Sequence, residues 1–326
     1  MGLDCVSVNI TSSTEVFAGS EPSLNEPRRD LESQILKDNE ENKNKIWWRL
    51  GIDLPLFIIV LILVALFEMG MLPHYRSGFH CNDPALSYPF RGDTVSMSAI
   101  LSTIVLLPFV IIFITEILLF DSAYSARTKL DYASRRTIVL YRNYVYGMFF
   151  NLGIVEVMKA ITGSPRPTFF DICEPDAAKT CNGSEYVSTF ECTSTRFPKW
   201  YQTDSYHSFP SGHTSLSVYC GFFLAWYLQR RAFSWQNRIV FLVPIVQLLC
   251  LTYAAICSLT RITDRRHHWW DVLTGAIIGL ATSLYAVLVI SKNFNQKSKS
   301  TEEKTMTESQ HTVRTLVFDG PQQTVS

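Results

Sequence analysis

The chain lacks an excess of either charge, because its 29 Lys and Arg residues are balanced by 29 Asp and Glu residues. That balance gives no support for a nucleic-acid partner. The sequence also lacks the G-x-x-x-x-G-K-S/T pattern of a P-loop, so chemistry on nucleoside triphosphates has no support. A cleavable signal peptide is not expected, because the first 45 residues are polar and the first apolar run is too long for a signal core. The M-G-x-x-x-S/T pattern of N-myristoylation fails at Val6.

The chain does contain long apolar blocks, which are typical of a membrane protein. A helix of about 20 apolar residues crosses a bilayer, and six segments approach this criterion. They are residues 51–72, 95–120, 144–161, 215–228, 239–259 and 269–290. The sequence therefore predicts an all-α integral membrane protein with six transmembrane helices, in a membrane domain at residues 46–291. The polar segments 1–45 and 292–326 are predicted to be disordered tails.

The distribution of Lys and Arg predicts the orientation of these spans. With the N-terminus inside the cell, the inner segments hold about 19 basic residues and the outer segments about 10. Both termini are therefore predicted to be cytosolic. The long segment between the third and fourth spans is predicted to face outward or into a lumen.

The predicted outer segments carry features of secreted and lumenal proteins. They contain four cysteines, which are Cys81, Cys173, Cys181 and Cys192. In an oxidising compartment these would form one or two disulfides, and the sequence leaves their pairing open. The triplet Asn182-Gly183-Ser184 is a glycosylation acceptor, so Asn182 is predicted to be modified. The plasma membrane is the expected location.

Polar residues gather where three of the predicted spans meet the outer side. Lys159 lies at the end of the third span, with Arg166 just beyond it. The segment Pro210-Ser211-Gly212-His213 precedes the fourth span, and a helix N-terminus there would favour an anion. Cations and helix N-termini that converge at one depth suit a phosphate group. The same cations would repel a metal ion, so neither a metal nor another cofactor is expected.

The third polar segment runs from Arg261 to Asp271 and contains His267 and His268. If the apolar run that follows is a helix, His267 and Asp271 stand one turn apart on the same face. A carboxylate in that position fixes the imidazole tautomer and leaves the far ring nitrogen free as a base, a nucleophile or a ligand. His268 also reaches Asp271 at a helical spacing of three residues and competes for the same role.

These segments resemble, in order, the three-part signature of the type-2 phosphatidic acid phosphatase superfamily. The matching patterns are Lys159-x6-Arg166-Pro167, Pro210-Ser211-Gly212-His213 and Arg261-x5-His267-x3-Asp271. The predicted spans, the glycosylation acceptor between the first two patterns and the run at residues 166–173 are similar to lipid phosphate phosphatases in particular. The likeness covers residues 46–291, and Thr260 stands where the family usually has Ser.

The resemblance implies a metal-independent phosphohydrolase that acts on lipid phosphates at the outer or lumenal membrane face. His267 would attack the phosphorus and form a phosphohistidine, with Asp271 orienting the ring. His213 would protonate the leaving alkoxide and then activate water. The groups that would hold the phosphate are Lys159, Arg166, Ser211, Gly212 and Arg261. The resemblance favours His267 as the nucleophile and leaves His268 as a capping or interfacial residue.

The substrates that this resemblance implies are phosphatidic acid, lysophosphatidic acid, sphingosine phosphate and ceramide phosphate. The expected partners are this lipid phosphate and the surrounding membrane lipids, and the sequence leaves homo-oligomerisation open. One alternative is a lipid phosphotransferase of the sphingomyelin synthase kind, which passes the headgroup to another lipid. A second alternative is a catalytically silent lipid-binding relative, although such relatives generally lose signature residues and this chain retains them all.

Overall fold

The computed structural model describes residues 55, 58–62, 65–66, 75–120, 128–233 and 241–294. The chain divides into two compact units, residues 1–59 and 60–326, and the elements described below belong to the second. The predicted span at 51–72 lies largely outside the described residues. The predicted N-terminal tail and the C-terminal tail beyond residue 294 lie outside them as well.

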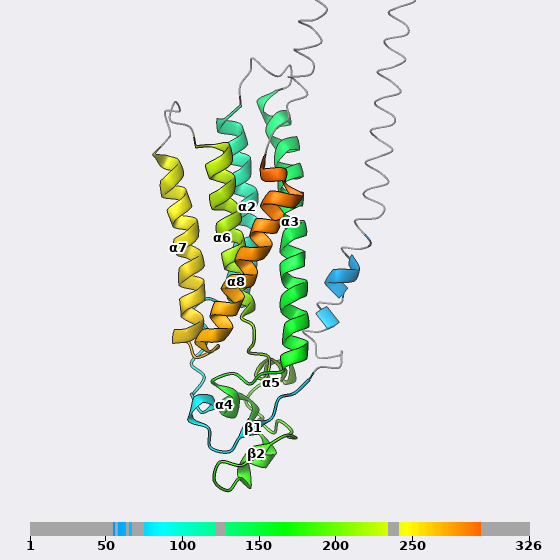
Figure 1. The fold of residues 1–326 in the computed structure, drawn as a ribbon, viewed down its shortest axis with the longest axis vertical. Helices are drawn as coiled ribbons and strands as arrows, with labels where there is room; N and C mark the ends of the chain where they lie inside the picture. Colours follow the sequence, from blue (N-terminus) through cyan, green and yellow to red (C-terminus); the bar gives the residue numbers. More distant parts are fainter. Residues whose placement is uncertain are drawn as a thin grey trace, which may run out of the picture. The chain divides into compact units, whose positions relative to one another are not determined.

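Long helices form a bundle in the described part of the chain. They are α2 (Met97–Leu118), α3 (Lys129–Thr162), α6 (Gly212–Arg231), α7 (Leu242–Thr263) and α8 (Trp269–Tyr285). Figure 1 shows them side by side, and α8 continues into the π-helical turn Ala286–Ile290. Within the described residues four helices are long and apolar enough to cross a membrane, namely α2, α3, α7 and α8 with its extension. The fold is therefore mostly α-helical, with four candidate membrane spans.

Helix α6 lies among the other helices and contacts α2, α3, α7 and α8. Its sequence mixes Ser, Thr and Tyr with apolar residues, and it is not one of the four candidate spans. The physical reason is its position, because Tyr219, Phe223 and Tyr227 are fully buried against neighbouring helices. A helix shielded by other helices does not need an apolar surface for lipid. Gly221 allows close packing, since a Cβ there would lie 2.8 Å from the backbone oxygen of Cys250 on α7.

The outward surfaces of the other helices are apolar. Leu106 on α2 is 62% exposed, Leu248 on α7 is 66% exposed and Ile161 on α3 is 68% exposed. Exposure of such side chains to water costs about 25 cal/mol for each Å² of apolar surface. Many exposed large apolar side chains on neighbouring helices indicate contact with lipid.

Helix α3 is longer than the span predicted at residues 144–161, which is only its second half. The helix begins after the N-cap Thr128 and continues for 34 residues. Its first half carries charges such as the pair Asp131 and Arg135, 2.9 Å apart, which favour a helix but fail an apolar criterion. The helix ends at Gly163, whose φ of 50° lies in the left-handed region. A Cβ there would lie 1.9 Å from the carbonyl oxygen of Tyr75, so only glycine fits.

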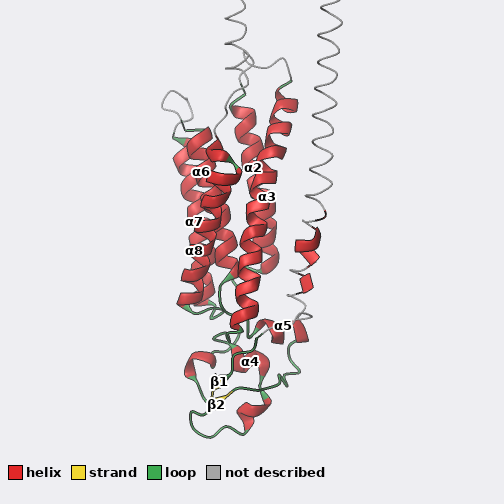
Figure 2. Ribbon diagram, turned by 45° about the vertical axis from the view of Figure 1, so that its right-hand side comes forward, coloured by secondary structure: helices red, strands yellow, loops and turns green. Residues whose placement is uncertain are grey.

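A cap, formed by residues 75–95 and 164–210, covers one end of the bundle (Figure 2). Its elements are α4 (Phe169–Cys173), α5 (Lys199–Asp204) and the antiparallel strands β1 (Phe79–His80) and β2 (Tyr186–Val187). The ring of Phe79 packs against those of Phe169 and Phe190, with centroids 5.5 and 5.6 Å apart. The cap therefore has a small aromatic core of its own.

Two disulfides cross-link the cap, Cys81–Cys181 and Cys173–Cys192. The four cysteines that the sequence assigns to the outer side are thus all paired, in a connectivity that the sequence left open. The first bridge joins residues 100 positions apart. It fastens the segment that precedes α2 to the segment that follows α3.

Candidate active site

Three polar segments of the sequence meet at the capped end of the bundle. Lys159 lies in the last turn of α3, His213 in the first turn of α6 and Asp271 in the first turn of α8. A backbone bond of 2.8 Å from the N–H of Arg166 to the carbonyl oxygen of Ser205 joins the chain after α3 to the chain before α6. The signature segments are therefore brought to one place.

One buried side chain ties the same three helices together below the site. The amide of Asn151 on α3 donates to Thr282 Oγ1 on α8 at 2.8 Å, and its oxygen accepts from Ser215 on α6 at 3.0 Å. Asn151 and Ser215 are completely buried. A buried polar network whose members are paired favours one arrangement of the groups that form it. The positions of the three helices are therefore fixed relative to one another.

Helices α6 and α8 also touch directly at the site. The N–H of Ser211 donates to the carbonyl oxygen of Asp271 at 3.1 Å. A Cβ on Gly275 would come within 2.5 Å of the Ser211 carbonyl oxygen, and a Cβ on Gly279 would come equally close to that of Ser215. Glycine at these two positions of α8 allows the first turns of the two helices to pack backbone to backbone.

His267 is buried, with 3% of its surface exposed. Its Nδ1 lies 2.7 Å from the carbonyl oxygen of Ser208, so Nδ1 carries the proton and donates it to that bond. Nε2 therefore keeps its lone pair. Burial lowers the pKa of His267 to about 4, with Arg166 adding to the effect and Asp271 opposing it. The imidazole is thus neutral near pH 7, as a nucleophile must be.

Asp271 contacts His267 through Ser208 rather than directly. Asp271 Oδ2 lies 3.8 Å from His267 Nδ1, which is beyond hydrogen-bond distance, so the direct bond predicted from the helical spacing is not formed. The hydroxyl of Ser208 instead donates to Asp271 Oδ2 at 2.6 Å, while its carbonyl oxygen holds the imidazole. The helical spacing could not show this, because Ser208 is 59 positions from His267 in the chain.

His268 has the contacts of a capping residue. Its N–H donates to Asp271 Oδ2 at 2.8 Å and so closes the first turn of α8. Its Nδ1 is 3.2 Å from the same oxygen. Its ring stacks on Trp270, with centroids 4.5 Å apart. The carboxylate of Asp271 therefore contacts the N–H and the ring of His268 as well as the hydroxyl of Ser208.

His213 meets the same charged groups from the first turn of α6. Its Nε2 is buried and has no hydrogen-bond partner among the residues that the structure describes. Burial, together with the charges of Arg261, His267, Arg166 and Lys159, lowers the pKa of His213 to about 2, so this imidazole is neutral near pH 7. A buried ring nitrogen surrounded by cations is suited to an anionic ligand.

Lys159 and Arg166 are each held by a carboxylate. Lys159 Nζ lies 2.8 Å from Glu156 Oε1, about one turn away on α3. Gly212 faces this lysine, because a Cβ on Gly212 would lie 3.8 Å from Nζ. Arg166 pairs with Asp204 at the end of α5. Burial acts to raise the pKa of Asp204, but Arg166 and neighbouring cations lower it to about 2, so this carboxylate stays ionised.

Arg261 is almost completely buried, with 1% of its surface exposed. Its Nη1 donates to Asp93 at 3.0 Å, and its Nη2 donates to the carbonyl oxygen of Val95 at 3.0 Å and to Asp264 at 3.2 Å. Its Nε is buried and has no hydrogen-bond partner in the described part of the chain. The terminal nitrogens are therefore fixed, and the Nε–H remains for a ligand.

Ser211 is the N-cap of α6 and is completely buried. Its Oγ accepts from the N–H of Thr214 at 3.5 Å and lies 3.1 Å from Thr214 Oγ1. As the acceptor in both bonds, the hydroxyl keeps its own hydrogen for donation. Gly212 starts α6, where backbone N–H groups have no partner within the helix.

Sequence reasoning missed three residues that contact the predicted site. They are Asp93, Asp204 and Ser208. They lie in loops or at the end of α5, and no spacing connects them with the signature segments. The sequence held one indirect signal for these carboxylates. Buried arginines require carboxylate partners, and the predicted spans supply few, so the partners had to come from the loops.

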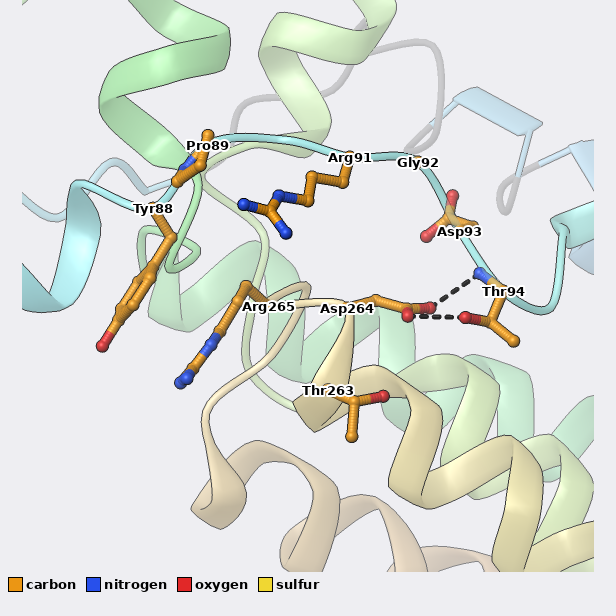
Figure 3. Close-up of a pocket in the computed structure, with 9 residues that line it drawn as sticks. All are labelled: Tyr88, Pro89, Arg91, Gly92, Asp93, Thr94, Thr263, Asp264 and Arg265. Atoms are coloured by element: carbon orange, nitrogen blue, oxygen red, sulfur yellow. Dashed lines mark hydrogen bonds between the residues drawn. The ribbon is translucent and has the colours of Figure 1, made fainter.

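A cavity of about 700 Å³ lies beside the carboxylates that hold Arg261 (Figure 3). It is lined by the segment at residues 88–94, which precedes α2, and by the end of α7. Asp264 accepts from the N–H and the hydroxyl of Thr94 at 2.8 and 2.7 Å. The segment before α2 is therefore fastened to the end of the helix that carries Arg261.

The donors of the site suit an anion better than a metal. In segments 75–120, 128–233 and 241–294, no three His, Cys, Asp or Glu residues are grouped as metal ligands. The groups that converge are guanidinium, ammonium, imidazole and hydroxyl groups, which bind phosphate oxygens.

Known proteins are similar to this chain in sequence. A family model described as the PAP2 superfamily matches residues 140–295, which contain all three signature segments. Phospholipid phosphatase 2 of Bos taurus is 31% identical over 249 residues, covering 73% of this chain and 83% of that protein. Phospholipid phosphatase 2 of Mus musculus is 30% identical over 226 residues, covering 68% of this chain and 79% of that protein.

A putative phosphatidate phosphatase of Drosophila melanogaster is more distant. It is 27% identical over 276 residues, covering 78% of this chain and 72% of that protein. No solved structure shows significant similarity to this chain.

Proposed function

The chain belongs to the PAP2 superfamily and is a lipid phosphatase, and from this we propose that it hydrolyses lipid phosphomonoesters through a phosphohistidine on His267. The bond from His267 Nδ1 to Ser208 carries this proposal, because it leaves Nε2 unprotonated inside a cluster of cations. The substrates proposed are phosphatidic acid, lysophosphatidic acid, sphingosine phosphate and ceramide phosphate.

In the first step Nε2 of His267 attacks the phosphorus, and the bond from phosphorus to the lipid oxygen breaks. The negative charge of the bound phosphate would raise the pKa of His213, and the protonated ring would give its proton to the leaving alkoxide, which departs as the lipid alcohol. In the second step neutral His213 takes a proton from water, whose oxygen attacks the phosphorus. The phosphorus–nitrogen bond breaks, so that inorganic phosphate leaves and both histidines return to the state they have with substrate bound.

The phosphoryl oxygens would be held by Lys159, Arg166 and Arg261, with the Ser211 hydroxyl and the Gly212 N–H. Phosphoryl transfer depends mainly on positioning and on stabilisation of charge on these oxygens. Support comes from the Nε–H of Arg261, which is buried without a partner among the described residues. Asp271 would support the nucleophile through Ser208, whose hydroxyl and carbonyl oxygen contact the two residues.

The proposed topology has six spans, with the tails at residues 1–45 and 292–326 in the cytosol and the cap outside the cell or in a lumen. The plasma membrane is the proposed location. The two disulfides of the cap support an oxidising compartment, and Asn182 is exposed on the cap, as a glycosylated asparagine must be. A site where the helices meet the cap would receive a phosphate headgroup while the acyl chains stay in lipid.

The proposal is tested by phosphate release from a lipid phosphate in detergent micelles that contain no acceptor lipid. Wild-type protein should release inorganic phosphate at the same rate with and without EDTA, and His267→Ala should release none while still being inserted and glycosylated. Absence of phosphate release, with transfer of the group to an added acceptor lipid, would indicate a phosphotransferase instead. Substantial turnover by His267→Ala, with loss of turnover in His268→Ala, would move the nucleophile to His268.

A further inference from the structure

Arg266 lies in the middle of a row of alternating charges that joins two arginines of the active site. Its Nη2 donates to Asp204 Oδ2 at 3.0 Å, and its Nε lies 3.1 Å from Asp93 Oδ1 in an ion pair without hydrogen-bond geometry. Asp93 also holds Arg261 at 3.0 Å, and Asp204 also holds Arg166. The row therefore runs Arg261, Asp93, Arg266, Asp204, Arg166 without a break.

The members of the row come from four parts of the chain, because Arg261 and Arg266 belong to the same polar segment. Arg261 ends α7, Asp93 precedes α2, Arg266 precedes α8, Asp204 ends α5 and Arg166 follows α3. Each aspartate contacts two arginines, and Arg266 contacts both aspartates. Removal of Arg266 would leave each aspartate with one arginine of the row and would remove the side chain that joins its two halves.

Arg266 is buried and lies close to two aromatic rings. It is 4% exposed, and its guanidinium lies 5.1 Å from the ring of Phe90 and 5.2 Å from the ring of Tyr201. A cation against aromatic rings gains further attraction when water is excluded. The fork of a guanidinium can contact two carboxylates at fixed angles, which an ammonium group cannot.

The adjacent Arg265 provides a contrast. It is exposed, has a φ of 56° and places its guanidinium 4.3 Å from the ring of Tyr88. No ion pair joins it to a carboxylate within the described residues, and it lies at the cavity of Figure 3, outside the row of charges. Arg265 and Arg266 thus carry the same guanidinium group, but Arg265 is exposed and Arg266 is buried.

We propose that Arg266 is a positioning residue, which acts through Asp93 and Asp204 to fix the guanidinium groups of Arg261 and Arg166 where the phosphoryl group is held. This inference rests on the proposed function, in which those two arginines hold the phosphate. In this role Arg266 acts through the two aspartates and not on the reacting atoms. Its effect is transmitted because each aspartate fixes an arginine only as firmly as the aspartate is itself fixed.

The test uses the full-length protein in micelles with a short-chain phosphatidic acid, and compares Arg266→Met with the matched control Arg265→Met. Phosphate release gives kcat and KM, and orthovanadate gives an inhibition constant that reports phosphoryl binding apart from turnover. Misplacement of a binding group by about 1 Å can cost on the order of 100-fold. We expect Arg266→Met to lower kcat/KM by about 10- to 100-fold and to raise the vanadate constant by a similar factor.

Arg265→Met should stay within about twofold of wild type in both measurements, since changes at exposed residues outside the row are small. Arg266→Lys keeps the charge but can contact one carboxylate at a time, so it should recover part of the loss. The effects of Arg266→Met and Arg261→Lys should combine to less than their product, because both act on the same group.

The proposal is overturned if folded Arg266→Met binds vanadate as wild type does, if Arg265→Met loses as much activity, or if the effects of Arg266→Met and Arg261→Lys multiply independently. Should Arg266→Met fail to accumulate, Arg266→Lys and Asp93→Asn decide the question by the same measurements. Failure of the underlying function looks different: Arg261→Lys alone would then leave both kcat/KM and vanadate inhibition unchanged.

Discussion

Acidification should destabilise the folded protein through His267, because this imidazole is buried in its neutral form. Its pKa is lowered from the ordinary value of 6.5 to about 4 by burial and by Arg166, against the opposing effect of Asp271. Between these two values the unfolded chain binds a proton that the folded chain does not. The free energy of unfolding therefore falls as the pH drops below about 6.5 and levels off below about 4.

The size of the effect follows from the difference between the two pKa values. One pKa unit corresponds to about 1.4 kcal/mol, so the complete loss from His267 is about 3 kcal/mol. For a membrane domain of this size, that loss lowers the melting temperature by on the order of 5–10 °C. The assay is thermal unfolding in micelles, followed by tryptophan fluorescence, at about pH 7.5 and about pH 4.5.

His267→Gln removes the titrating group while keeping a polar side chain, so its melting temperature should fall less on acidification than that of wild type. His80→Gln is the matched control, because His80 is exposed in β1 of the cap. It should show the same dependence on pH as wild type. Equal dependence on pH in His267→Gln and wild type would refute the burial of a neutral imidazole at this position.

Two further predictions concern parts of the bundle with different roles. Gly275→Ala places a Cβ 2.5 Å from a backbone oxygen at the start of α6, so it should lower kcat by about 10-fold or more. The control Gly153→Ala on α3 places a Cβ that meets nothing within 4 Å, so its kcat should equal that of wild type. A kcat for Gly275→Ala equal to that of wild type would contradict the proposed contact. Glu116 on α2 is fully buried and 2.9 Å from Arg231 on α6, so Glu116→Gln should cost about 3 kcal/mol of stability with kcat/KM retained. Asp131→Asn, at an exposed pair, should cost less than about 1 kcal/mol, and equal losses in the two variants would argue against the buried pair.

The helices of the bundle that expose apolar side chains to lipid could be predicted from their composition. The segments 95–120 and 239–259 correspond to Met97–Leu118 and Leu242–Thr263, because both helices expose apolar faces. The first half of α3 was missed, since its charged residues favour a helix without being apolar. Helix α6 was predicted only at residues 215–228, although it extends over Gly212–Arg231. An apolar criterion shortens such a helix, because burial among other helices allows it to carry polar residues.

The candidate site was predictable only where its residues lie on helices at fixed spacing or match a known signature. His267 and Asp271 were paired through helical spacing, yet Ser208 mediates their contact. Asp93 and Asp204 reach the arginines from loops and from the end of α5, and nothing local in the sequence encodes that approach. Local sequence patterns therefore cannot predict side-chain partners that only the tertiary fold brings together.

The backbone contact between Ser211 and Asp271 has a consequence for how the enzyme works over time. The proposed acid and nucleophile stand at the ends of two helices that touch at Gly275, so we expect their separation to change little during turnover. The two imidazoles would then be in position before substrate binds. We expect turnover in a membrane to be governed by how often a lipid arrives in the mouth of the site, with the reacting groups idle in between.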